Sequence, residues 1–105
     1  MKNPFKGLIR KNSIPDSEFY KVVLTMAGIE YKAESMTIDG ALEALGLSWE
    51  QIKAKGVITV SKGSSSYEML FYPKQLKRIF ANKLTRMMWG KRLQMLLESK
   101  TNDHH

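Results

Sequence analysis

The chain has 105 residues, 43% of them hydrophobic, and carries 17 lysines and arginines against 10 acidic residues, a net charge of +7. This length and apolar content predict one folded domain and argue against a disordered protein. No apolar run reaches 18 residues, and the N-terminus lacks the apolar segment of a secretory signal, so we expect neither a membrane span nor export. The absence of cysteine excludes disulfides and fits a cytoplasmic location.

The basic residues cluster at both ends of the chain. Residues 1–15 contain four of them and residues 69–97 contain seven, and neither stretch contains an acidic residue. Most of the acidic side chains lie between residues 16 and 50. An excess of positive charge favours a nucleic-acid partner or an acidic protein surface, although it also serves solubility alone.

Three segments are expected along the chain. Residues 1–15 contain prolines and no periodic apolar pattern, which predicts a basic, flexible arm. Residues 16–100 are expected to form the single domain. Residues 101–105 form a polar tail, whose two histidines we interpret as a solvated terminus and not as metal ligands.

Residues 16–28 fit two structures. Phe19, Val22, Val23 and Met26 have the spacing of one helix face, although β-branched and aromatic residues also favour a strand. We predict a helix that ends at Gly28. Residues 29–35 then alternate as a strand.

Two short helices are expected next. Thr37 is suited to cap a helix over residues 38–45, and Gly46 supplies the left-handed residue that ends it. Ser48 and Gln51 have the spacing of a capping box, which predicts a second helix that ends near Gly56. With one residue between Gly46 and Ser48, the two helices must cross steeply, as in a helix-turn-helix.

A hairpin and a long helix complete the prediction. Residues 57–62 and 67–72 are β-prone and flank a Gly-Ser tip, which indicates a two-stranded hairpin. Pro73 is well placed to begin a helix. Residues 74–99 have a helical apolar stripe, which shifts to another side near Gly90, so we expect either a kink there or self-association.

The segment from residue 36 to residue 80 resembles the winged helix-turn-helix of MerR-type regulators and excisionases. The matching residues are Leu45-Gly46-Leu47-Ser48, Ile52, Gly56-Val57-Ile58, Tyr67, Tyr72, Leu76 and Ile79. The resemblance implies a small single α+β domain, with a helix-turn-helix followed by a two-stranded wing and a long C-terminal helix. It also implies that the second helix enters the major groove of duplex DNA and that the wing contacts the phosphates.

The leading hypothesis is therefore a nucleic-acid-binding protein, of phage or mobile-element type, that regulates or assists DNA transactions. Gln51 is expected to read adenine, and the lysines of the second helix guanine or phosphate. Trp49 is expected to pack on the wing, and the alternative is that it lies exposed as a contact. The predicted nucleic-acid-binding residues are Gln51, Lys53, Lys55, Lys62, Ser64, Ser65, Lys77 and Arg78. Binding of RNA by the basic last helix is a weaker alternative.

The rival hypothesis is a protein-interaction module, such as a phage assembly factor or an inhibitor of a host complex. Tryptophan and arginine are enriched at interaction hot spots, and both occur in the last helix; the alternative for Trp89 is that it covers the protein's own core. The predicted partner-binding residues are Arg86, Trp89, Lys91, Arg92, Leu93 and Leu96. If the last helix pairs with itself, the partner is a second copy of the chain and the protein is a homo-oligomer.

Catalysis is not expected. The chain has no cysteine, its two histidines are the last two residues, and the Gly-Ser stretch lacks the frame of a phosphate-binding loop. The carboxylates have no companion base or metal-ligand spacing. We therefore predict no enzyme activity, no cofactor, no metal and no small-molecule substrate.

Overall fold

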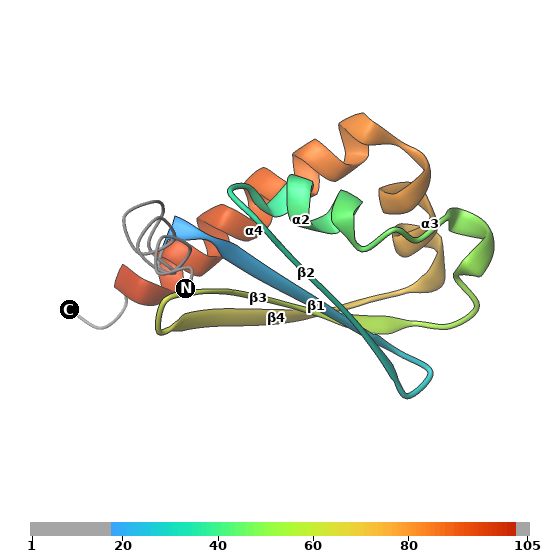
Figure 1. Ribbon diagram of the computed structural model, residues 1–105, viewed down its shortest axis with the longest axis horizontal. Helices are drawn as coiled ribbons and strands as arrows, with labels where there is room; N and C mark the ends of the chain where they lie inside the picture. The colour runs from blue at the N-terminus through green and yellow to red at the C-terminus, as the bar shows by residue number, and fades with distance from the viewer. Residues whose placement is uncertain (1–17, 103–105) are drawn as a thin grey trace, which may run out of the picture.

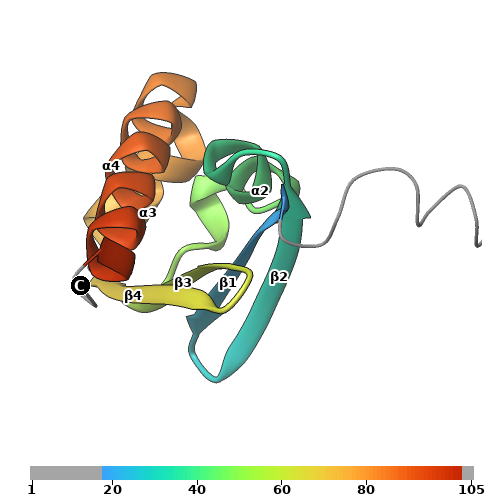
Figure 2. The ribbon, with the colours of Figure 1, turned by 90° about the vertical axis from the view of Figure 1, so that its left-hand side faces the viewer.

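The computed structural model describes residues 18–102, with side chains through residue 99. This part of the chain has two layers, an antiparallel sheet and the helices that cover one of its faces (Figure 1). Seen from the end, α2 and the α3–α4 pair lie above the sheet on the same side (Figure 2). In chain order, the elements are β1 (Tyr20–Met26), β2 (Ile29–Ser35), α2 (Ile38–Ala44), the one-turn 3-10 helix η2 (Trp49–Gln51), β3 (Gly56–Lys62), β4 (Ser65–Phe71), α3 (Pro73–Ala81) and α4 (Lys83–Asn102).

The sheet contains four strands in the order β2-β1-β3-β4, and all neighbours are antiparallel. β1 therefore lies in the interior of the sheet, paired with β2 on one side and with β3 on the other. Alternate residues of each strand face the helices, where they form the core. The fully buried side chains of that core are Val22, Leu24, Ala41, Leu42, Ile58, Val60, Phe71, Leu76, Ile79 and Leu93.

The prediction of a helix over residues 16–28 is wrong, because residues 20–26 form β1. Burial alternates along this strand: Val22 and Leu24 are fully buried, whereas Lys21 and Thr25 are exposed. The helical spacing in the sequence arose because Val23, on the outer face of the sheet, is apolar too. Gly28 has a φ of +80° and belongs to the two-residue turn between β1 and β2, not to a helix end.

The predicted strand over residues 29–35 is confirmed as β2, and the helix that follows is confirmed as α2. The Thr37 side chain accepts a hydrogen bond from the Gly40 backbone N–H at 3.1 Å, which caps the helix at its N-terminus. Gly46 has a φ of +72°, so it supplies the left-handed residue that was expected after the helix.

The predicted helix-turn-helix is wrong, because its second helix is the single turn η2. The capping box is present, with the Ser48 N–H donating to Gln51 Oε1 at 2.8 Å. After this turn, Ile52 adopts an extended conformation and is buried against the core. The chain then has to reach Gly56, where β3 begins, so there is no length for a reading helix.

The predicted hairpin is confirmed as β3 and β4, but the prediction that it forms a wing is wrong. In a winged helix-turn-helix the hairpin projects beside the helices, whereas here β3 pairs along its length with β1 and completes the central sheet. Gly56 allows this pairing, because a Cβ atom there would lie 2.9 Å from Leu24 Cδ1. The fold is thus an antiparallel sheet covered by helices on one face, which is an α+β architecture, and the order of helix-turn-helix, wing and long helix that the resemblance implied is wrong.

The predicted long last helix is divided in two. Pro73 begins α3 as expected, but Asn82 leaves the helical conformation, with φ −133° and ψ 120°. Its Oδ1 accepts from the Thr85 N–H at 3.0 Å, so Asn82 caps the start of α4. The expected kink at Gly90 is not observed, since α4 runs through this residue as one helix.

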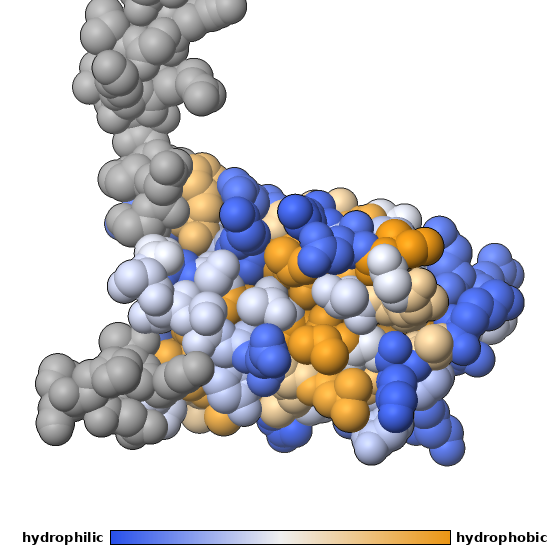
Figure 3. Space-filling model, turned by 90° about the horizontal axis from the view of Figure 1, so that it is seen from below, coloured by the Kyte–Doolittle hydropathy of each residue, from blue (hydrophilic) through white to orange (hydrophobic). Residues whose placement is uncertain are grey.

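Within residues 18–102, no helix or strand covers the face of the sheet opposite the helices (Figure 3). Its central apolar residues are Val23 and Val57, which are half-buried, and Leu70, which is 46% exposed. Around them lie the polar and charged side chains of the same strand faces, among them Lys32 and Glu68.

Candidate nucleic-acid interface

A hollow of about 360 Å³ lies between η2 and the start of α3. Its lining combines an aromatic ring, two lysines, one carboxylate and apolar side chains. The lining residues are Trp49, Glu50, Ile52, Lys53, Pro73 and Lys77.

Local contacts fix both walls of the hollow. On one side, the hydrogen bond between Ser48 and Gln51 holds the η2 turn, and the buried Ile52 anchors it to the core. On the other side, the Tyr72 N–H donates to Gln75 Oε1 at 2.9 Å, and Pro73 takes the first position of α3. Because both walls are held this way, the side chains at the rim project from a rigid support.

Two aromatic side chains are exposed at or beside this hollow. Trp49 is 50% exposed and lines the hollow with Pro73 and Lys77, which agrees with the second of the two expectations for it. Tyr72, which precedes Pro73, is 57% exposed. Aromatic rings in this state present large flat surfaces on which another ring can stack.

The lysines of the hollow are available to an anion. Within residues 18–99, the structure has an ion pair between Lys32 and Glu30 at 3.5 Å, and it has none at Lys53 or Lys77. Glu50 lies in the same hollow and opposes an anion there. The remaining charge on this side is positive, because α3 also exposes Lys74 and Arg78.

The structure brings together some of the predicted nucleic-acid residues and separates others. Lys53 and Lys77 meet at the hollow, and Arg78 lies on the exposed side of α3. Lys55 is exposed between η2 and β3. Gln51 is engaged in the Ser48 cap, so its carbonyl group does not project as a base reader.

The tip of the β3–β4 hairpin lies at the other end of the sheet from the hollow (Figure 1). Seven residues of β3 span about 20 Å, and this length separates Lys62, Ser64 and Ser65 from Lys53. The Lys62 ammonium lies 4.7 Å from the centre of the Tyr20 ring. The tip and the η2 turn therefore do not form one surface, contrary to the prediction.

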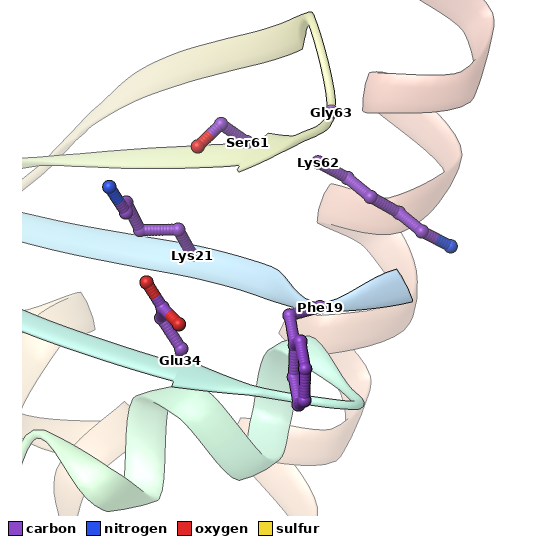
Figure 4. Close-up of a pocket in the computed structure, with 6 residues that line it drawn as sticks. All are labelled: Phe19, Lys21, Glu34, Ser61, Lys62 and Gly63. Carbon is purple, nitrogen blue, oxygen red and sulfur yellow. The ribbon is translucent and has the colours of Figure 1, made fainter. Parts of the chain in front are cut away.

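A second hollow, of about 260 Å³, lies at this end of the sheet (Figure 4). Lys21 and Glu34 face each other in the register of β1 and β2, and Figure 4 shows Lys62 pointing away from both. Its lining residues are Phe19, Lys21, Glu34, Ser61, Lys62 and Gly63. Both hollows are lined by two lysines and one glutamate, but here the Lys62 ammonium lies over the Tyr20 ring and points away from Lys21, so the two positive charges do not converge, which makes this hollow a poor site for a polyanion.

Most of the predicted partner-binding residues serve the fold. Leu93 is fully buried, and Leu96 is half-buried. The Trp89 ring meets Phe71 edge-on, with the ring centres 4.9 Å apart, and the Arg92 guanidinium lies 4.8 Å from the centre of Trp89. Arg86 donates to the Ile79 carbonyl at 3.0 Å.

Lys91, like Arg92, is exposed on α4. The stripe of Trp89, Leu93 and Leu96 was interpreted as a second apolar face, but it is the face that packs on the sheet. Exposure of Tyr72 was not expected from the sequence, and exposure of Trp49 was the second of two expectations. The sequence signals available for these two rings were the cap residues Ser48 and Pro73, because they fix the backbone next to Trp49 and Tyr72.

Within residues 18–102, no helix has the length and apolar character that a membrane crossing requires, and no cluster of three metal-binding side chains occurs. Comparison of the chain with models of protein families, with curated proteins and with solved structures gives no match.

Proposed function

We propose that this protein binds nucleic acid through the surface formed by η2 and α3, and that its ligand is a single-stranded segment. The observation that carries the proposal is the hollow itself, where the exposed Trp49 stands beside the unpaired Lys53 and Lys77. The proposed role is binding without catalysis. The absence of cysteine fits a cytoplasmic location for it.

A single strand suits this surface better than a duplex. Proteins that bind single strands combine aromatic rings, on which bases stack, with basic side chains that follow the phosphates. Trp49 and Tyr72 supply the rings, and Lys53, Lys77 and Arg78 supply the charges. A duplex keeps its bases stacked inside, and one 3-10 turn is too short to read its major groove.

The proposal is tested by the affinity of the full chain for a labelled oligothymidine of about 15 nucleotides, measured by fluorescence anisotropy over a range of salt concentrations. Log affinity should fall with log salt by about 0.7 for each phosphate contacted in a single strand. Lys53→Ala and Lys77→Ala should each reduce this slope by about that amount. Trp49→Ala should weaken binding by roughly 1–3 kcal/mol, the contribution of one stacked base.

Two control variants make the test specific. Lys62→Ala removes one positive charge at the other end of the sheet and should leave the slope unchanged. Glu50→Gln removes the carboxylate from the hollow and should strengthen binding. Equal losses for Lys62→Ala and Lys53→Ala, or no binding at low salt, would show the proposal to be wrong.

A further inference from the structure

The outer side of α4 carries an apolar stripe that the described part of the chain does not cover. Leu84 is 74% exposed, Met88 47% and Met95 67%. Their spacing places them on one side of the helix, opposite the buried Leu93 and Leu97. At 1.5 Å per residue, the stripe from Leu84 to Met95 is about 16 Å long.

Basic side chains surround this stripe. Lys83 lies at its start, Lys91 lies within it, and Arg92 lies along one side; all three are exposed. The first acidic residue on α4 is Glu98, beyond the end of the stripe. A partner for this surface therefore needs apolar side chains in a row and negative charge beside them.

We propose that the outer face of α4, defined by Leu84, Met88, Lys91 and Met95, binds an acidic amphipathic helix of another protein. Apolar residues of such a helix, at i, i+3, i+4 and i+7, would meet the leucine and the methionines. Its glutamates would meet Lys83, Lys91 and Arg92, which steers association. Methionine suits this role, because its flexible side chain adapts to different apolar partners.

A second copy of this chain is a poor occupant. Symmetric antiparallel pairing of two α4 helices about the middle of the stripe places Leu84 opposite Met95 but also Met88 opposite Lys91, and pairing about Lys91 places Lys91 opposite Lys91. Parallel pairing in register also places Lys91 opposite Lys91. Like charges in the centre of an interface oppose association.

The basic N-terminal sequence and nucleic acid are poor occupants too. Residues 1–15 carry four positive charges and no negative one, so they repel Lys83, Lys91 and Arg92. Leucine and methionine side chains offer no hydrogen bonds to phosphates. The α4 surface is separate from the hollow beside η2, so this proposal goes beyond nucleic-acid binding.

The test uses the full chain and a labelled synthetic peptide of about 18 residues, with leucine at the helical stripe positions and glutamate at the flanks. A peptide of the same composition in scrambled order is the control probe. Anisotropy should show binding of the ordered peptide and at least roughly tenfold weaker binding of the scrambled one. Leu84→Ser and Met95→Ser should each weaken binding of the ordered peptide by roughly tenfold.

The control is Leu70→Ser, which removes an apolar side chain about as exposed as that of Met88 from the opposite face of the sheet and should not change peptide affinity. Lys91→Glu should weaken peptide binding, and Leu84→Ser should leave oligothymidine affinity unchanged. Equal binding of both peptides, or no effect of Leu84→Ser, would overturn the proposal. So would a dimer in analytical ultracentrifugation that Met88→Ser dissociates, because the occupant would then be a second copy.

Discussion

Gly90 in the middle of α4 lies directly against Asp39 in the first turn of α2. A Cβ atom on Gly90 would lie 3.0 Å from the Asp39 backbone nitrogen and 3.1 Å from Asp39 Cβ. The missing side chain therefore lets the two helices approach closely above the sheet. This close contact between α2 and α4 explains why a glycine occurs at position 90, inside a helix that continues through it.

Replacement of Gly90 tests this close approach. Alanine favours an isolated helix by about 1 kcal/mol over glycine. In this position, however, the methyl group meets the Asp39 backbone nitrogen and Cβ, which cannot rotate away, and overpacking of this kind costs about 1–3 kcal/mol. We expect Gly90→Ala to lower the free energy of unfolding, measured by urea denaturation.

The control for Gly90→Ala is Gln94→Ala, an exposed substitution on the same helix, which should change stability by less than about 0.5 kcal/mol. A gain of about 1 kcal/mol for Gly90→Ala would mean that α2 and α4 are not in close contact.

Trp89 is expected to stabilise the fold and not to serve a partner. Its edge-on contact with Phe71 and its place against the core predict that Trp89→Ala lowers the free energy of unfolding by about 3 kcal/mol. Arg92→Ala removes a cation from an exposed ring face and should cost about 0.5–1 kcal/mol. Both values follow from chemical denaturation, and an unchanged stability of Trp89→Ala would refute this assignment.

Asn82 separates α3 from α4, and its side chain caps the second helix. Asn82→Ala removes the acceptor for the Thr85 N–H and should cost about 1 kcal/mol of stability in thermal or urea denaturation. Asn82→Asp keeps an acceptor at this position and should retain most of that stability. Equal losses for the two variants would show that the cap does not contribute.

The η2 turn depends on the Gln51 side chain. Gln51→Ala removes the acceptor for the Ser48 N–H and should cost about 1 kcal/mol. The Ser48 amide should then exchange with solvent faster, as measured by hydrogen exchange. Gln51→Glu keeps the acceptor and should preserve the protection, so fast exchange in that variant would contradict the capping role.

The correct parts of the sequence analysis depended on local signals. Thr37 and Gly46 mark the ends of α2, and Pro73 marks the start of α3, because caps and turns involve residues a few positions apart. The hairpin over β3 and β4 followed from two β-prone runs and a Gly-Ser tip. Each of these features can be recognised without knowledge of the rest of the molecule.

The incorrect parts depended on contacts distant in sequence. Residues 20–26 form a strand because β2 and β3 pair with both sides of it; the β-branched and aromatic residues of the segment allowed a strand, but the local pattern also fitted a helix and could not decide. The choice of apolar face in α4 likewise depends on Phe71, which meets Trp89 from another element. Lys53 and Lys77 share a hollow only because η2 packs against α3.

The most direct test of the proposed function is a map of the oligothymidine site by heteronuclear NMR. On addition of oligothymidine, the account predicts the largest chemical-shift changes at the Trp49 indole N–H and at the amides of Lys53 and Lys77. It predicts small changes at Lys62 and Ser64 on the hairpin tip. Changes confined to that tip or to the face of the sheet opposite the helices, with the Trp49 signal unmoved, would contradict it.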